Sequence, residues 1–129
     1  MPRRTSPHPT ELELEILKIL WRDGPRSVRD VRDALAPFRD LAYTSVMTIM
    51  NIMLRKGYVK RSKEGGYFVY RPRITRESTA RRMLGDMVDR VFDGSATALM
   101  VNLLETAEID PDELKELRKR INRKAKEGS

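Results

Sequence analysis

The sequence predicts a mostly helical chain with one small β-hairpin, of the α+β class, in which three helices precede the hairpin and three follow it. Two observations lead to this prediction. Apolar residues recur at intervals of three and four along most of the 129 residues, which is the period of an amphipathic helix. Residues 58–72 are the exception, because β-branched and aromatic residues there flank the segment KEGG, as in two strands joined by a tight turn.

The first two helices are marked by capping residues at their starts. Thr10 and Glu13 have the spacing of a capping box, in which each side chain accepts a hydrogen bond from a backbone amide of the first turn. Ser27 and Asp30 repeat that spacing, and a Gly-Pro pair and a proline end the two helices. Their apolar stripes are Leu12, Ile16, Ile19 and Leu20, then Val28, Val31 and Leu35.

The third helix, expected between Leu41 and Gly57, has two contrasting faces. Its core face consists of Val46, Ile49, Met50 and Met53, and its opposite face of Thr44, Met47, Thr48, Asn51 and Arg55. The opposite face lacks the Glu and Lys residues that usually cover a solvated helix. Asn pairs with adenine through two hydrogen bonds, and Thr methyl groups pack against the thymine methyl. We interpret this as a DNA recognition helix, with a surface helix of unusual composition as the alternative.

The hairpin is basic and has glycines at its tip. Its strands are YVKRS and YFVYR, and Gly65 and Gly66 supply the positive φ angles of a tight turn. Three helices and a basic hairpin form a winged helix-turn-helix, in which the third helix enters the major groove and the hairpin lies along the DNA backbone. Thr44 and Ser45, at the helix N-terminus, are equally placed to bond phosphate. We expect Thr44, Ser45, Thr48 and Asn51 to read bases, and Arg55, Lys60, Arg61 and Lys63 to hold the backbone.

Positive charge is concentrated in the N-terminal part of the chain. Residues 1–73 contain 15 Lys or Arg and 8 Asp or Glu, whereas residues 74–129 contain 11 of each, so the whole net charge of +7 belongs to the first part. We interpret the basic part as one that meets a polyanion and the balanced part as one that meets protein. On charge alone, a generically basic protein is the alternative.

The C-terminal part is expected to form three short amphipathic helices. Ser95 is placed to cap one of them, and Asp110, Pro111 and Glu113 mark the start of the last. Three such helices leave an apolar patch that needs a partner. We therefore expect a two-fold homodimer and a palindromic DNA target, with packing against the chain's own DNA-binding part as the alternative. The expected dimer residues are Met83, Leu84, Met87, Val88, Val91, Phe92, Leu99, Leu103, Leu104, Leu114, Leu117 and Ile121.

These patterns divide the chain into four parts. We expect a flexible basic arm over residues 1–9, a winged-helix DNA-binding domain over 10–73, a helical dimerisation domain over 74–124 and a flexible tail over 125–129.

Composition argues against enzymes, metal centres and membrane insertion. The chain has no cysteine and a single histidine, His8, so a zinc site, a Ser-His pair and a cysteine nucleophile are not expected. We expect no cofactor and no catalytic residue. No apolar run approaches the roughly 18 residues of a membrane span, and the N-terminal segment lacks the apolar core of a secretion signal. We therefore expect a cytoplasmic protein.

Several segments in a fixed order carry a family resemblance. They are residues 9–35, residues 41–61, the YRP of residues 70–72, VFDGSATALMVNLLE at 91–105 and DPDELKELRKRI at 110–121. With these the chain resembles the BlaI/MecI/CopY family of bacterial penicillinase-type repressors, from Pro9 to about Arg123. The resemblance implies a homodimeric winged-helix repressor on dyad operators, often containing TACA and TGTA, that controls resistance or stress genes. The alternative function is a winged-helix protein-interaction module without sequence-specific DNA binding.

The resemblance also bears on induction. In penicillin-responsive members of the family, a membrane receptor protease is encoded nearby, and the repressor is cut between an Asn and a Phe. Asn102 and Leu103 stand at the matching place, so the Asn is present and the Phe is not. This makes Asn102 and Leu103 the candidate cleavage site and a receptor protease a candidate partner. Copper-responsive members carry a C-terminal cysteine cluster, which this chain lacks.

Overall fold

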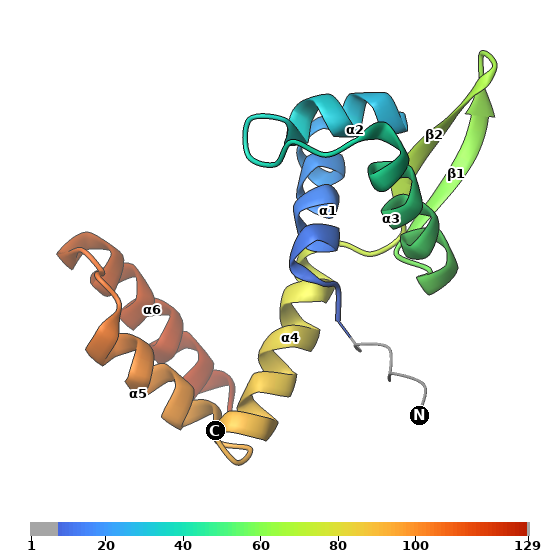
Figure 1. Ribbon diagram of the computed structural model, residues 1–129. Coiled ribbons are helices and arrows are strands. Elements are labelled where there is room, and N and C mark those ends of the chain that lie inside the picture. Colours follow the sequence, from blue (N-terminus) through green and yellow to red (C-terminus); the bar gives the residue numbers. More distant parts are fainter. Residues whose placement is uncertain (1–7, 129) are drawn as a thin grey trace. The chain divides into compact units, whose positions relative to one another are not determined.

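The computed structural model describes residues 8–128 and contains the predicted succession of elements. The fold class is confirmed: three helices, an antiparallel hairpin and three further helices follow one another along these residues (Figure 1). The elements are α1 (Glu11–Asp23), α2 (Val28–Leu35), α3 (Tyr43–Lys56), β1 (Val59–Glu64), β2 (Tyr67–Pro72), α4 (Arg76–Val91), α5 (Ala96–Thr106) and α6 (Pro111–Glu127).

The described residues form two compact units, the first ending at Gly85 and the second beginning at Asp86. The division lies inside α4, whereas we expected a domain boundary near residue 74. The segment that leads into α4 is tied to α1, because the Trp21 Nε1 group donates a hydrogen bond of 2.9 Å to the Ile74 carbonyl. The Arg76 guanidinium also lies 5.9 Å from the centre of the Trp21 ring. These contacts extend the first unit beyond the hairpin.

The predicted terminal segments lie partly outside the residues that the structure describes. Most of the expected arm, residues 1–7, and Ser129 are outside the described residues. At the other end, α6 continues to Glu127, beyond residue 124 at which we expected the helical domain to end. The extra residues are mainly Lys, Ala and Glu, which are good helix formers, and Gly128 follows as the C-cap.

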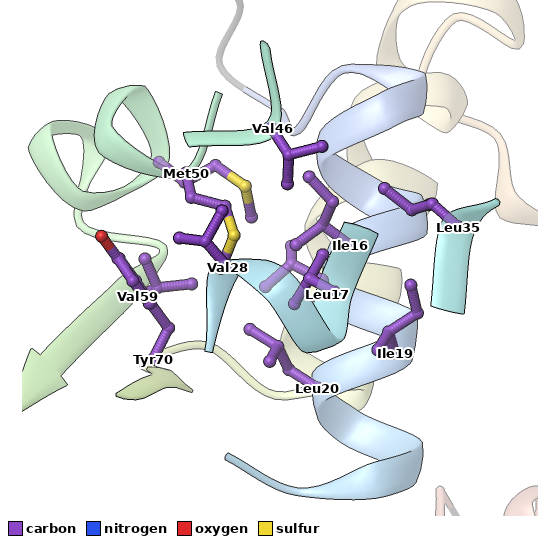
Figure 2. Close-up of a cluster of buried hydrophobic side chains, with 12 residues drawn as sticks. Ile16, Leu17, Ile19, Leu20, Val28, Leu35, Val46, Met50, Val59 and Tyr70 are labelled. Carbon is purple, nitrogen blue, oxygen red and sulfur yellow. The ribbon is translucent and has the colours of Figure 1, made fainter. Parts of the chain in front are cut away.

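The core of the first unit collects the apolar stripes of α1, α2 and α3 and one face of the hairpin. Figure 2 shows these side chains pointing toward one another from all of those elements. Burying an aliphatic side chain of this size contributes about 1.5–3 kcal/mol, so this cluster dominates the stability of the unit. Its buried members are Ile16, Leu17, Ile19, Leu20, Val28, Val31, Leu35, Val46, Met50, Met53, Val59 and Tyr70.

The predicted caps are present, although only one is a full capping box. The Thr10 hydroxyl accepts from the Glu13 amide at 3.2 Å, and the Glu13 carboxylate accepts from the Thr10 amide at 2.8 Å. The Ser27 hydroxyl accepts from the Asp30 amide at 3.2 Å, but the structure shows only this half of the pair. Aspartate is one methylene shorter than the glutamate of a capping box, which shortens its reach back to the cap amide.

The hairpin is joined to the helices by a short additional ladder. Gly65 and Gly66 have φ angles of 60° and 88°, so the two-residue turn has the positive φ values of type I′, as predicted. Tyr70 on β2 exchanges two backbone hydrogen bonds, of 3.1 and 2.9 Å, with Arg26 in the loop between α1 and α2. This bridge fixes the hairpin against the start of α2.

A buried ion pair connects α1 to α3. The Lys56 ammonium lies 3.0 Å from both carboxylate oxygens of Glu13, and the two side chains are 18% and 4% exposed. The same carboxylate caps α1, so Glu13 serves both helices. Removing one member of a buried pair leaves an uncompensated charge, which is strongly destabilising.

The second unit has no core of comparable depth. None of the residues of α5 and α6 is buried. The Ser95 hydroxyl caps α5 through the Ala98 amide, and the Asp110 carboxylate caps α6 through the amides of Asp112 and Glu113. Capping hydrogen bonds thus define the starts of these helices, while their apolar residues remain exposed or half-buried. Within residues 8–128, no helix combines the length and apolarity needed to cross a membrane.

The Glu13–Lys56 pair gives a direct test of the packing between α1 and α3. We expect Lys56→Met to lower the free energy of unfolding by about 3 kcal/mol, because the Glu13 carboxylate stays buried without its partner. Urea denaturation followed by tryptophan fluorescence measures this, since Trp21 is the single tryptophan of the chain. Lys18→Met, at an exposed position of α1, is the control and should stay within about 0.5 kcal/mol of the unsubstituted chain. Equal small losses in both variants would contradict this account.

Candidate nucleic-acid interface

The outward face of α3 carries the short polar side chains that the sequence predicts there. Thr44, Ser45 and Thr48 are exposed and Asn51 is half-buried, while Val46, Met50 and Met53 on the opposite face are fully buried. The helix begins after Ala42, which offers no side-chain cap, so the amides of the first turn are not satisfied by a capping group. Such a helix start favours a negatively charged ligand. Met47, expected on the outward face, packs partly against the core.

Thr48 is held in a defined rotamer by its own helix. Its hydroxyl donates a 2.9 Å hydrogen bond to the Thr44 carbonyl one turn earlier. The hydroxyl proton is therefore used within the helix, and the side chain offers a methyl group and an acceptor oxygen to a ligand. This combination suits apolar contact with a thymine methyl better than donation to a base.

A groove of about 690 Å³ lies between the start of α2, the outward face of α3 and the hairpin. It is bordered by positive, polar and aromatic side chains, which is the composition expected where a nucleic-acid backbone is held. Its lining residues include Ser27, Arg29, Asp30, Tyr43, Met47, Asn51, Arg61, Tyr67, Phe68 and Tyr70.

Four of these lining side chains contact one another. The Arg61 Nη1 group donates to the Asn51 Oδ1 atom at 3.3 Å and to the Tyr70 hydroxyl at 3.2 Å. The Tyr70 hydroxyl in turn donates to Asn51 Oδ1 at 3.4 Å. The Arg61 guanidinium lies over the Phe68 ring, 4.0 Å from its centre. The contacts join α3 to both strands of the hairpin, and we call these four residues the Arg61 cluster.

In the Arg61 cluster the carboxamide oxygen of Asn51 is already used as a hydrogen-bond acceptor. Pairing with adenine uses both ends of the carboxamide, since the oxygen accepts from N6 while the nitrogen donates to N7. In this structure the Asn51 oxygen already accepts from Arg61 and Tyr70. Reading adenine would require these two bonds to be exchanged for a base contact, so the expected base-reading role of Asn51 remains a prediction with a competing structural role.

The residues expected to hold the DNA backbone are all exposed but do not share one surface. Alternation along β1 places Arg61 and Lys63 on the face whose cross-strand neighbours are Tyr70 and Phe68. Lys60 lies on the other face, opposite Arg71. The structure therefore brings Arg61 and Lys63 to the side of the hairpin that carries the Arg61 cluster and separates Lys60 from them. Arg55 is exposed in the last turn of α3.

Most groove residues were missed by the sequence reasoning, since only Asn51 and Arg61 of the expected DNA contacts line the groove. Arg29 at the start of α2, Tyr43 at the start of α3 and Phe68 on β2 line the groove but stood outside the expected interface. Phe68 was detectable, because strand alternation across a two-residue turn places it opposite Lys63. Arg29 and Tyr43 offered no such signal, since their position depends on how the helices pack.

The candidate cleavage site lies within a helix. Asn102 and Leu103 are exposed residues of α5, and the Asn102 carbonyl accepts a 2.8 Å hydrogen bond from the Thr106 hydroxyl. Because helical backbone must be unwound to reach an extended conformation, a cut here requires local opening of α5 first. In residues 8–128, no group of three or more His, Cys, Asp or Glu side chains is arranged to hold a metal ion.

Comparison with known proteins shows the family of the chain. The family description for penicillinase repressors matches residues 9–123, which is nearly the whole chain. The chain belongs to the penicillinase repressor family. This confirms the resemblance found in the sequence.

Relatives of the family cover most of the chain. It is 24% identical over 111 residues to the penicillinase repressor of Bacillus licheniformis, covering 86% of this chain and 87% of that protein. It is 32% identical over 113 residues to the transcriptional regulator BlaI of Mycobacterium tuberculosis, covering 86% and 80%. The solution structure of the DNA-binding domain of the repressor BlaI matches with a TM-score of 0.50 and 26% identity, covering 57% of this chain and 90% of that one. The winged-helix arrangement is thus shared with the DNA-binding domain of the repressor BlaI.

Proposed function

We propose that this protein is a sequence-specific transcriptional repressor that acts as a homodimer on palindromic operator DNA in the cytoplasm. The observation that carries the proposal is the groove in which Asn51 of α3 meets Arg61 and the aromatic side chains of the hairpin. Relatives named penicillinase repressor and methicillin resistance regulatory protein support it. No catalytic step is part of the proposed function.

In this proposal the exposed face of α3 and the basic residues have different tasks, and of the residues involved only Arg61 lines the groove itself. Thr44, Ser45 and Thr48 lie on the exposed face of α3, where side chains of this size reach base edges in the major groove. Arg55, Arg61 and Lys63 supply positive charge for phosphates, and none of the three forms an ion pair with any carboxylate in residues 8–128. Phosphate contacts supply most of the affinity and base contacts supply the specificity.

The homodimer is proposed from the exposed apolar residues of the second unit. Val91 is 68% exposed, Leu104 56% and Ile121 51%, although all three lie in well-formed helices. A second copy of the same surface, related by a two-fold axis, would bury these residues without any further protein. The residues expected for this interface are half-buried or exposed at every position from Met83 to Ile121.

The dimer would also account for a palindromic operator and for tight binding to it. Two recognition helices related by a two-fold axis read two half-sites related by the same symmetry. Linking two half-site contacts makes the second one intramolecular, so the dimer binds far more tightly than two separate copies. A cut between Asn102 and Leu103 would break the chain between α4 and α6 and remove Leu104, Leu114, Leu117 and Ile121 from the interface.

Specific binding is tested by fluorescence anisotropy of the full chain with its own upstream DNA and with a scrambled duplex, at several salt concentrations. We expect at least about a thousandfold tighter binding to the upstream DNA, and a steep salt dependence on both duplexes. Equal affinity for the two would contradict sequence-specific repression. Binding to neither duplex would favour the alternative, in which the winged helix contacts a protein partner.

The dimer is tested with Leu117→Asp, which places a carboxylate in the proposed interface. Since Leu117 is 41% exposed in the single chain, the substitution should leave the helices folded. We expect the dimer to dissociate about a hundredfold more readily, as measured by sedimentation velocity, and operator affinity to fall with it. Lys119→Ala, at a more exposed position of the same helix, is the control and should sediment as the unsubstituted chain does. A dimer of unchanged stability in Leu117→Asp would contradict the assigned interface.

A further inference from the structure

Arg61 is the most constrained charged side chain of the groove. Its Nη1 group bonds two partners, Asn51 on α3 and Tyr70 on β2, and its guanidinium plane lies over the Phe68 ring. Contacts to a carboxamide, a hydroxyl and an aromatic face restrain the guanidinium from three directions. An arginine on a strand surface ordinarily keeps most of its rotamer freedom, so this restraint needs an explanation.

We infer that Asn51 and Tyr70 position Arg61 to bind a DNA phosphate between α3 and the hairpin. Asn51 is then a positioning residue and not a base-reading residue. The inference rests on the proposed function and names the task of one cluster within it. It replaces a direct contact between Asn51 and adenine with an indirect contribution through Arg61.

The free edge of Arg61 fits a phosphate. Both hydrogen bonds from the Arg61 side chain to protein use Nη1. In residues 8–128, its Nε and Nη2 groups form no hydrogen bond and its guanidinium forms no ion pair. Nε and Nη2 present two parallel N–H groups on one edge of the guanidinium. Two parallel donors match two oxygens of a phosphate group, and such charge-assisted pairs are stronger than neutral hydrogen bonds.

Holding Arg61 before DNA arrives lowers the cost of binding. Fixing a free arginine side chain costs conformational entropy. In the Arg61 cluster this cost is met during folding, so a phosphate meets a side chain that is already oriented. Stacking on Phe68 also covers one face of the guanidinium, which directs its remaining donors along the plane of the group.

The anchor of the cluster is Tyr70. Its side chain is 2% exposed and belongs to the core, and its backbone is bonded to Arg26 in both directions. The hydroxyl group is therefore fixed by the same packing that holds the hairpin to the helices. Because Tyr70→Phe removes the hydroxyl and keeps the ring, it tests the positioning without emptying the core.

The experiment is a double-mutant cycle on DNA binding by the full chain, read by anisotropy on upstream and scrambled duplexes at several salt concentrations. The variants are Arg61→Ala, Asn51→Ala, Tyr70→Phe and the combination of Asn51→Ala with Arg61→Ala. Lys18→Ala, which removes one exposed positive charge from α1 outside the groove, is the control. Circular dichroism confirms that each variant is folded.

We expect Arg61→Ala to weaken binding to both duplexes by about tenfold and to lower the salt slope by about one per protomer, as loss of a phosphate contact does. Asn51→Ala and Tyr70→Phe should each weaken both duplexes by several-fold. In the Arg61→Ala background, Asn51→Ala should have no further effect, because the residue it positions is gone. A purely structural role of Asn51 would not produce this loss of effect.

Three results would overturn the inference. Asn51→Ala weakening upstream DNA alone, with the same loss in the Arg61→Ala background, would make Asn51 a base reader. An unchanged salt slope in Arg61→Ala would remove the phosphate contact. The proposed function is tested separately, by the unsubstituted chain. If that chain binds neither duplex, both the proposed function and the inference are overturned. If it binds the two duplexes equally, sequence-specific repression is overturned, and the mutant cycle still tests the role of Arg61.

Discussion

The candidate interface depends on one buried tyrosine that belongs to the core and to the groove at once. Tyr70 packs among the core residues of the first unit (Figure 2). It pairs through its backbone with Arg26 and reaches Asn51 and Arg61 with its hydroxyl. The backbone and the side chain of this single residue therefore contact the loop before α2, the middle of α3 and β1. Because interiors are close-packed, a shift of this ring would move all three together.

The two units solve different physical problems with similar helices. In the first unit, α1 to α3 bury their apolar stripes against one another and leave a polar and basic surface. In the second, α5 and α6 leave their stripes exposed, and their caps rather than their packing define where they begin. In the proposed dimer this unit would gain stability from association, and the strength of DNA binding would then depend on protomer concentration.

Local features of this fold were predictable from the sequence, and contacts between distant residues were not. The Thr10–Glu13 capping box, the Gly65-Gly66 turn and the two faces of α3 follow from the spacing of a few neighbouring residues. The bridge from Arg26 to Tyr70 and the Glu13–Lys56 ion pair join residues that are 44 and 43 positions apart, and periodicity does not specify such partners. The same limit applies to Asn51: its place on the outward face was predictable, whereas its bonds to Arg61 and Tyr70 depend on how the hairpin packs against α3.

The most direct test of the central claim, that α3 and the hairpin form the DNA-binding surface, is to map amide chemical shifts of the full chain by NMR as upstream duplex is added. We expect the largest changes on residues 43–51 of α3, on residues 61–68 of the hairpin and at the start of α2, with little change at Lys18 on α1. Changes centred on α5 and α6, with α3 and the hairpin unaffected, would contradict it.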